Sequence, residues 1–289
     1  MRHIVALSLA VSVVAGLAPP AMAQGSLTET TLEKMGRTGV LIIGTRTSSP
    51  PFAYITRKNE WVGFSIDLVQ QGVLPAVSKK VGKSVKLEKK ESTPATRVTL
   101  LVSRSVDLIA GTMTDAPDRR ADVDFSMTFF LTGGQFLVKQ GSPIKGIEDI
   151  ADKRVAALQR STYARIIREQ VPKANLLEFP DQADAFRALV QGKVDAYTND
   201  GMQLSGLKSK VPDLKTYEVV GRLYTREPYA LALRKGDNAF RDVVDAGLRN
   251  LLESGKYFEI YEKWFGPKSE TPYPMTPEAK EYLLAQLKK

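Results

Sequence analysis

Two stretches of this chain follow one pattern: residues 100–107 read LLVSRSVD and residues 188–195 read ALVQGKVD. Each starts as the end of an amphipathic helix, passes through a polar turn and reaches Val-Asp before a short apolar strand. The first strand leads to Thr114 and the second to Asn199 and Asp200. Because open α/β sheets bind ligands at the carboxyl ends of their strands, the pattern predicts two related α/β lobes whose polar strand ends face a shared cleft.

Short apolar strands alternate with amphipathic helices along most of the chain, which is typical of an α/β protein with largely parallel sheets. The predicted strands cover residues 40–44, 85–89, 108–111, 135–138, 154–157, 176–179, 196–198, 217–220 and 229–233. The predicted helices cover residues 30–35, 66–80, 94–103, 162–170, 181–190, 202–209, 238–253 and 257–264.

Residues 1–23 resemble a cleaved secretion signal. They contain the basic residue Arg2, an apolar run over residues 4–18, and the small-residue pattern AMA at residues 21–23. The run is shorter than the roughly 20 residues that span a bilayer. Because the 289 residues include no cysteine, no thiol is present to hold a lipid anchor. We therefore expect a freely diffusing protein of the bacterial periplasm.

The residue types exclude several kinds of site. The only histidine, His3, lies in the predicted signal, so thiolate or imidazole metal sites, disulfides and histidine-assisted nucleophiles are not expected. We accordingly predict no catalytic residue, no metal and no cofactor. The net charge of +9 comes from lysines and arginines interleaved with acids, which argues against a nucleic-acid partner and favours an anionic small molecule.

Segments spread over nearly the whole chain form an ordered set. They read GVLIIGTR at 39–46, PF at 51–52, VGFSIDL at 62–68, GTMT at 111–114, DFS at 124–126, KRVA at 153–156, STYA at 161–164, DAYTND at 195–200 and YFEIYEKWFG at 257–266. This order resembles the amino-acid-binding proteins of bacterial ABC importers, family 3 of the solute-binding proteins, and within them the glutamate/aspartate-binding branch.

The resemblance implies a hinged, two-lobe periplasmic binding protein fold of type II, with the ligand in the cleft between the lobes. Residues 24–128 and 230–289 would then form lobe one and residues 134–224 lobe two, with hinge crossings at 129–133 and 225–229. The tail from Lys268 would pack on lobe one through a helix that starts after Thr276, with Pro277 at its first position.

An amino acid in a dry cleft needs a cation for its α-carboxylate and an anion for its α-ammonium. Arg119 follows the predicted strand at 108–111, and a guanidinium binds both carboxylate oxygens in a fork. The resemblance assigns the same role to Arg119, with Thr112 and Thr114 beside it. The alternative is that Arg119 forms a surface pair with Arg120.

The predicted anion is Asp200, which matches the family aspartate that accepts the α-ammonium; it could equally be the N-cap of the following helix. Ser161 and Thr162 open the predicted helix at 162–170, where unpaired N–H groups favour an anion. The family usually has glycine where this chain has Arg160, so the local backbone path stays open, and Arg160 would add a cation at the rim of the cleft.

Two further arginines match those that hold the side-chain carboxylate in glutamate/aspartate binders, namely Arg46 and Arg97. A buried arginine needs an anionic partner, so a salt bridge to a neighbouring acid is the alternative for each. The matching serine and histidine of the family are replaced by Pro94 and Gln182, and Gln182 is retained as a candidate contact. Phe52 is expected either to flank the ligand's methylenes or to belong to the lobe-one core.

These residues predict a monomeric binding protein that captures glutamate or aspartate and delivers it to an inner-membrane ABC permease. Two alternatives remain: a binder of a non-acidic amino acid, and a periplasmic dehydratase, similar to cyclohexadienyl dehydratase, on the same scaffold. A dehydratase needs a general acid in the cleft, and a substrate without an ammonium group would leave Asp200 unpaired.

Overall fold

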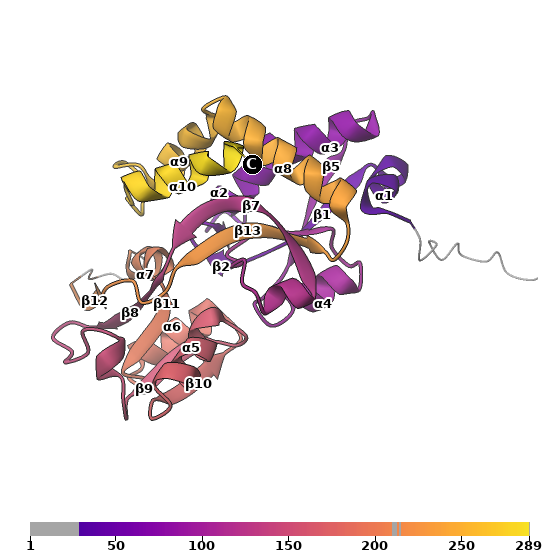
Figure 1. Cartoon of the computed structure of the whole chain (residues 1–289). Coiled ribbons are helices and arrows are strands. Elements are labelled where there is room, and N and C mark those ends of the chain that lie inside the picture. The colour runs from indigo at the N-terminus through magenta and orange to yellow at the C-terminus, as the bar shows by residue number, and fades with distance from the viewer. Residues whose placement is uncertain (1–28, 210–212, 214, 289) are drawn as a thin grey trace, which may run out of the picture.

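The computed structural model describes residues 29–209, 213 and 215–288, so the predicted signal peptide lies outside the described residues. The chain folds into two α/β lobes, each built on a five-stranded sheet (Figure 1). The predicted α/β two-lobe architecture is therefore confirmed. Within the part that the structure describes, no helix is long and apolar enough to cross a membrane.

The sheet of lobe one combines strands from the two ends of the chain. Its strands are Val40–Thr45 (β1), Lys86–Glu91 (β5), Leu108–Ile109 (β6), Val123–Thr132 (β7) and Glu227–Arg234 (β13). Their order is β5-β1-β6-β13-β7. β1 is parallel to both β5 and β6, whereas β13 is antiparallel to β6 and β7. A small antiparallel sheet joins Ser48–Ser49 (β2), Ala53–Ile55 (β3) and Trp61–Val62 (β4).

The sheet of lobe two has the same plan. Its strands are Gly134–Lys139 (β8), Arg154–Leu158 (β9), Asn175–Phe179 (β10), Ala196–Asp200 (β11) and Tyr217–Val220 (β12), in the order β10-β9-β11-β8-β12. β9 is parallel to β10 and β11, and β8 is antiparallel to β11 and β12. Both sheets thus consist of three parallel strands followed by one antiparallel strand and an edge strand.

The repeated Val-Asp pattern marks the same position in each sheet. Asp107 precedes β6, and its carboxylate accepts the Ile42 N–H of the neighbouring β1 at 2.9 Å. Asp195 precedes β11 and accepts the Arg154 N–H of the neighbouring β9 at the same distance. In each case the aspartate N–H also returns a bond to the carbonyl of that neighbour. The repeated sequence pattern therefore marks the same pair of hydrogen bonds between neighbouring strands in both sheets.

Helices cover both sheets. Lobe one carries Thr31–Thr38 (α1), Phe64–Leu68 (α2), Leu74–Val81 (α3), Arg97–Val102 (α4), Asn238–Glu253 (α8), Lys256–Phe265 (α9) and Pro277–Ala285 (α10), and lobe two carries Thr162–Gln170 (α5), Gln182–Val190 (α6) and Gly201–Lys208 (α7). A π-helical turn at Val69–Val73 joins α2 to α3 without a break. The predicted helix at 66–80 is therefore continuous, with one π-helical turn inside it.

The largest difference from the sequence expectation is β7. It is a ten-residue strand, whereas no strand was expected between 111 and 135 and residues 129–133 were expected to be only a crossing. The sequence VDFSMTFFLT of β7 departs from strict alternation, because side chains in its middle are buried on both faces. β7 pairs with β13 over nearly its full length.

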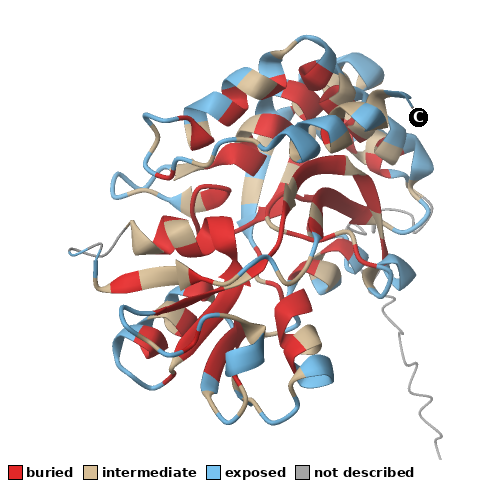
Figure 2. Cartoon of the chain, turned by 60° about the vertical axis from the view of Figure 1, so that its left-hand side comes forward, coloured by how far each residue is buried: buried red, intermediate tan, exposed pale blue. Residues whose placement is uncertain are grey.

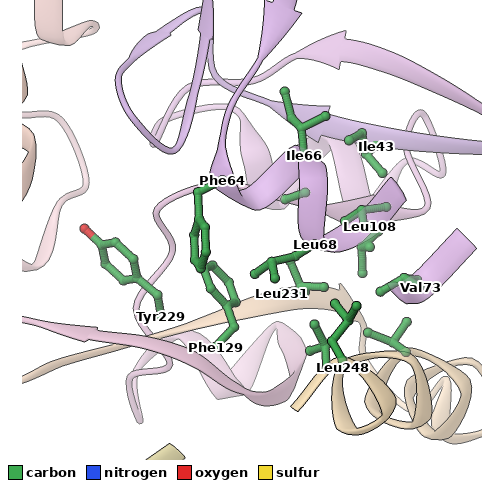
Figure 3. Packing of buried hydrophobic residues seen from close by; sticks show 14 of the residues in the cluster. Ile43, Phe64, Ile66, Leu68, Val73, Leu108, Phe129, Tyr229, Leu231 and Leu248 are labelled. Atoms are coloured by element: carbon green, nitrogen blue, oxygen red, sulfur yellow. The ribbon is translucent and has the colours of Figure 1, made fainter. Parts of the chain in front are cut away.

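The main core lies between the lobe-one sheet and its helices. Figure 2 shows buried residues concentrated along the strands and on the helix faces that cover them. In Figure 3, Phe64 and Phe129 pack beside Tyr229, while Leu231 and Leu248 join the sheet to α8. Aromatic rings of this size contribute both large apolar area and favourable edge-to-face contacts. The helix α9 contributes to this core through its buried residues Tyr257, Ile260 and Tyr261.

The chain crosses between the lobes twice, at adjacent points. It leaves β7 at Thr132 and enters β8 at Gly134, and it returns between Val220 and Glu227. The two crossing strands remain paired up to Thr132 and Glu227. Gly133 is required here, because a Cβ at this position would lie 2.2 Å from the Thr225 carbonyl oxygen. That these crossings act as hinges remains a prediction.

The C-terminal tail packs on lobe one. Thr276 caps α10 by accepting the Ala279 N–H, with Pro277 in the first turn. Gln286 then bonds both backbone groups of Thr128 in β7, at 2.7 and 2.9 Å. The tail is thereby fixed to the strand that leads to the first crossing.

The paired aspartates provide a test of the fold. Asp107 is 1% exposed and also holds Lys34 at 2.6 Å and Arg234 at 3.7 Å, whereas Asp195 pairs with the exposed Arg154. We expect Asp107→Ala to lower the free energy of unfolding by about 3 kcal/mol or more, and Asp195→Ala by about 1 kcal/mol. Urea denaturation measures both, and equal losses would contradict the proposed difference in burial.

Candidate ligand-binding site between the lobes

A small, partly open cavity lies where the two lobes meet. Its walls come from the carboxyl ends of β9 and β11, from the segment that follows β6, and from the start of α4 and α5. The lining residues of lobe one are Pro94, Arg97, Thr112, Thr114 and Arg119; those of lobe two are Leu158, Ser161, Thr162, Tyr163, Asn199, Asp200 and Gln203; Tyr229 comes from β13. Seven of these were candidates from the sequence.

Arg119 lies in a 3₁₀ turn behind β6 and is fixed from both lobes. Its Nη1 donates to the Thr114 carbonyl at 2.9 Å, and its Nη2 lies 3.4 Å from the Arg160 carbonyl across the cleft. Burial lowers the pKa of its guanidinium, an effect that Asp118 and Glu227 oppose. Arg120 is exposed and pairs with Asp115, so only Arg119 is directed to the cavity.

Arg97 is the most isolated buried cation of the site. It is 6% exposed, and its Nη1 donates to the Thr112 carbonyl at 3.0 Å. Among the described residues no carboxylate forms an ion pair with it. Its pKa is held well below the usual value, first by burial and then by repulsion from Arg119 and Arg46. Such a guanidinium strongly favours an anion in the adjoining cavity.

Asp200 supplies the opposite charge. It ends β11, is 1% exposed, and accepts hydrogen bonds from Gln203 Nε2 at 2.6 Å and from the Tyr229 hydroxyl. Its Oδ1 has no partner among the described residues. Burial, followed by repulsion from Glu227, raises its pKa to about 7. Although Asp200 stands at the N-cap position of α7, its side chain caps no N–H there.

The opening of α5 contributes polar groups. Ser161 is the N-cap, and its hydroxyl accepts the Ala164 N–H at 3.1 Å. Arg160 before it has a left-handed φ of 56°, a conformation that glycine adopts most easily, so the backbone here follows the path that a glycine would take. Its Nη1 donates to the Ala95 carbonyl at 3.1 Å. The unexpected arginine therefore ties lobe two to lobe one at the mouth of the cavity.

Arg46 is buried but does not line the cavity. Its Nη2 pairs with Asp181 of lobe two at 3.2 Å, and Ser48 donates to the same carboxylate at 2.7 Å. Asp181 also caps α6 by accepting the Ala183 N–H. Arg46 therefore forms the salt bridge to a neighbouring acid that the sequence offered as its alternative role. This salt bridge joins the two lobes. Nη1 of Arg46 remains without a partner among the described residues.

Two further candidates lie behind the cavity wall. Gln182 is fully buried, and its Oε1 accepts from Asn199 Nδ2 at 3.0 Å, so it supports the lining residue Asn199. Phe52 lies in the lobe-one aromatic core, in edge-to-face contact with Phe130 and Tyr229. A phenyl ring packed this deeply does not face a ligand. Of the two environments expected for Phe52, the structure shows the lobe-one core.

Sequence reasoning missed several residues of the site. Gln203 stands three residues after Asp200 in the first turn of α7, so helical spacing could have found it. Tyr229 gave no such signal, because its hydroxyl reaches Asp200 from a different lobe. Glu227 is 1% exposed and accepts the Thr114 hydroxyl proton. Within the described chain, no cluster of histidine, aspartate or glutamate residues could hold a metal ion.

Comparisons with known proteins identify the family of this chain. Residues 41–267 match the model of bacterial extracellular solute-binding proteins, family 3. A glutamine-binding protein of a Bacillus subtilis ABC transporter is 36% identical over 78% of this chain and 80% of its own. The glutamate/aspartate import solute-binding protein of Escherichia coli is 31% identical over 89% of this chain and 86% of its own.

Solved structures show the same architecture. An ancestral arginine-binding protein bound to glutamine is 32% identical, with a TM-score of 0.73 over 79% of this chain and 98% of its own. The solute receptor for L-cysteine of Neisseria gonorrhoeae is 25% identical, with a TM-score of 0.75 over 86% of this chain and 98% of its own. This chain belongs to family 3 of the bacterial extracellular solute-binding proteins.

Proposed function

We propose that this protein captures an acidic amino acid, glutamate or aspartate, in the cavity between its lobes and presents it to an ABC permease. An amino-acid-binding role for an ABC transporter follows from the family and from relatives that are themselves named as binding proteins. The same relatives place the chain among binding proteins and not among dehydratases. The acidic preference is the new element.

The two groups common to all amino acids have matching partners in the cavity. Arg119, with Thr112 and the opening of α5 at Ser161, offers donors to the α-carboxylate. Asp200 offers the α-ammonium an unpartnered, buried carboxylate oxygen. Since these groups come from both lobes, a ligand that touches all of them stabilises the closed arrangement.

Arg97 is the single observation that supports an acidic side chain. It is a buried guanidinium that lines the cavity, and its described hydrogen bond goes to the neutral Thr112 carbonyl. A side-chain carboxylate would supply the missing countercharge. Arg46 adds positive potential behind it, as the mutual repulsion with Arg97 indicates. In this proposal Arg46 also stabilises closure through Asp181, while Phe52 supports the ring of Tyr229.

A neutral amide ligand such as glutamine is the second candidate. Asn199 lines the cavity and bonds Gln182, whose Nε2 has no partner among the described residues. An amide-rich wall suits an amide side chain, and one relative is named for glutamine. The two candidates differ at Arg97: a side-chain carboxylate neutralises its charge, whereas the amide of glutamine does not.

The oligomeric state and the location of the protein are part of the same proposal. A monomer with a cleaved signal, residues 1–23, and no lipid anchor would diffuse in the periplasm between the ligand and its permease. Closure about the crossings would report ligand occupancy to that permease.

Substitution of Arg97 tests the acidic preference. We expect the wild-type protein to favour glutamate or aspartate over glutamine and asparagine by about a hundredfold or more, because an amide leaves Arg97 without a countercharge. Arg97→Met should weaken acidic ligands strongly and neutral ones little, whereas Arg119→Ala should weaken every amino acid. Titration calorimetry measures both patterns. Tighter binding of glutamine than of both acids would assign the cavity to the amide candidate.

Asp200 predicts an unusual dependence of stability on pH. Its raised pKa means that the folded protein keeps a proton on Asp200 that the unfolded chain has lost, so its contribution to stability falls as pH rises from about 4 to 7. Asp200→Asn should therefore melt a few degrees higher than wild type at pH 8 without ligand, about equally at pH 4.5, and bind no amino acid tightly. Scanning calorimetry at the two pH values decides this.

A further inference from the structure

Glu227 is a buried carboxylate for which the ligand contacts described above provide no role. It is the first residue of β13, lies at the return crossing, and is 1% exposed. Its backbone pairs with Thr132, the last residue of β7 at the other crossing. A carboxylate is costly to bury unless hydrogen bonds or charges compensate for lost hydration, so its contacts indicate what it does.

The carboxylate of Glu227 fixes the orientation of the Thr114 hydroxyl. Thr114 Oγ1 donates to Glu227 Oε2 at 2.5 Å, and the Thr114 backbone is bridged to Tyr229. A hydroxyl has one proton to donate, so with this proton directed to Glu227 its oxygen can only accept from its other neighbours. An acceptor in the cavity wall suits the ammonium group of a ligand. The Thr114 hydroxyl therefore differs from the carboxylate partner expected from the sequence.

The same strand connects Glu227 to Asp200. Glu227 and Tyr229 are two residues apart in a regular part of β13 and so share one face of the strand. Glu227 accepts from Thr114 of lobe one, and Tyr229 donates to Asp200 of lobe two. Repulsion from Glu227 is, after burial, the largest cause of the raised pKa of Asp200. Two neighbouring buried carboxylates do not both stay charged without a cation.

We propose that Glu227 is a positioning residue that makes the ammonium subsite hold one positive charge at all times, a proton on Asp200 in the free protein and the ligand ammonium in the complex. When the ligand enters, the Asp200 proton leaves to solvent and the ammonium takes its place. This inference rests on the proposed function to the extent that the ligand must carry an α-ammonium group.

The charged and titratable groups around Asp200 are consistent with this exchange. Gln203 of α7 and Tyr229 of β13 are neutral donors to its carboxylate. Tyr197 of its own strand β11 also acts on Asp200. The groups of the other elements packed there that act on it or lie beside it in the cavity are Arg97 of α4, Arg119 of the 3₁₀ turn at Arg119–Ala121, Tyr163 of α5, Tyr224 before β13, Glu227 and Tyr273 of the tail. Arg97 and Arg119 are the cations among these described groups, and neither forms an ion pair with Asp200.

Proton counting in a calorimeter tests the proposal. L-glutamate is titrated into the full chain at pH 6 and pH 8, in buffers with different heats of ionisation, so that the protons released per ligand are measured. We expect the wild-type protein to release about one proton at pH 6 and almost none at pH 8. If the wild-type protein binds glutamate without releasing protons at pH 6, the exchange does not occur.

Variants of Glu227 separate positioning from simple structural support. Glu227→Gln should release clearly less than half a proton at pH 6, because Asp200 loses its repelling neighbour, and should bind about tenfold more weakly at pH 8. Glu227→Asp keeps the charge and should restore most of the proton release. Thr132→Val is the matched control, since it changes the pairing partner of Glu227 at the crossing without changing charge, and it should behave as wild type.

The outcomes distinguish this inference from the proposed function. Failure of the wild-type protein to bind any of glutamate, aspartate, glutamine, arginine or cysteine would overturn the proposed function. Binding of a neutral amino acid would overturn only the acidic preference, and the proton count is then made with that ligand. The contrary result for Glu227 is a folded Glu227→Gln protein that releases as many protons as the wild type at both pH values and differs only in binding the ligand more weakly at both. That result would overturn the positioning role of Glu227. Should Glu227→Gln fail to fold, Thr114→Val tests the contact between the Thr114 hydroxyl and Glu227. Thr114→Val should lower the affinity for the ligand and leave the proton release unchanged.

Discussion

Charge that is removed from water must be matched by charge, and this constraint governs the space between the lobes. Arg97 and Arg119 approach it from lobe one, Asp200 from lobe two, and Glu227 from the strand that joins them. In isolation each would be costly to bury. Together they form a set of opposite charges that is incomplete at Arg97 and at the free oxygen of Asp200. In the proposed function, a zwitterion with an additional negative charge would complete both, and selectivity would follow from electrostatic balance.

The lobes are built to hold these charges in register. In both sheets an aspartate before the third parallel strand is bonded to the backbone of the neighbouring strand, Asp107 in one and Asp195 in the other. The polar residues that follow, Thr112 and Asp200, therefore emerge from equivalent strand positions. Pairing of β7 with β13 through the crossings keeps the two sets adjacent. Geometry that is local in each lobe thus produces a site that belongs to neither lobe alone.

Much of the fold could be predicted because it depends on short-range patterns. Strand and helix periodicity located the α-helices and nine of the strands but missed the short strands β2, β3 and β4. The strand-end argument located Arg119 and Asp200. The pattern could not find β7, whose two-sided burial removes the alternation that marks a half-exposed strand. Nor could it find the pairing of Arg46 with Asp181 or the contact of Glu227 with Thr114, because these join residues more than a hundred positions apart. Phe52 had two equally consistent environments, and only the packing of four aromatic rings around it chose between them.

The attachment of the tail to β7 has a practical consequence. Because Gln286 clasps both backbone groups of Thr128, α10 is a rigid extension of lobe one, on the opposite side of the crossings from α6. The chain contains no cysteine, so one cysteine introduced on an exposed face of α10 and another on α6 would be the only two thiols available for labelling. If the lobes close on the ligand as proposed, a pair of fluorescent dyes attached there would convert the angle between the lobes into an optical signal, and the protein would become a reagentless sensor for its own ligand.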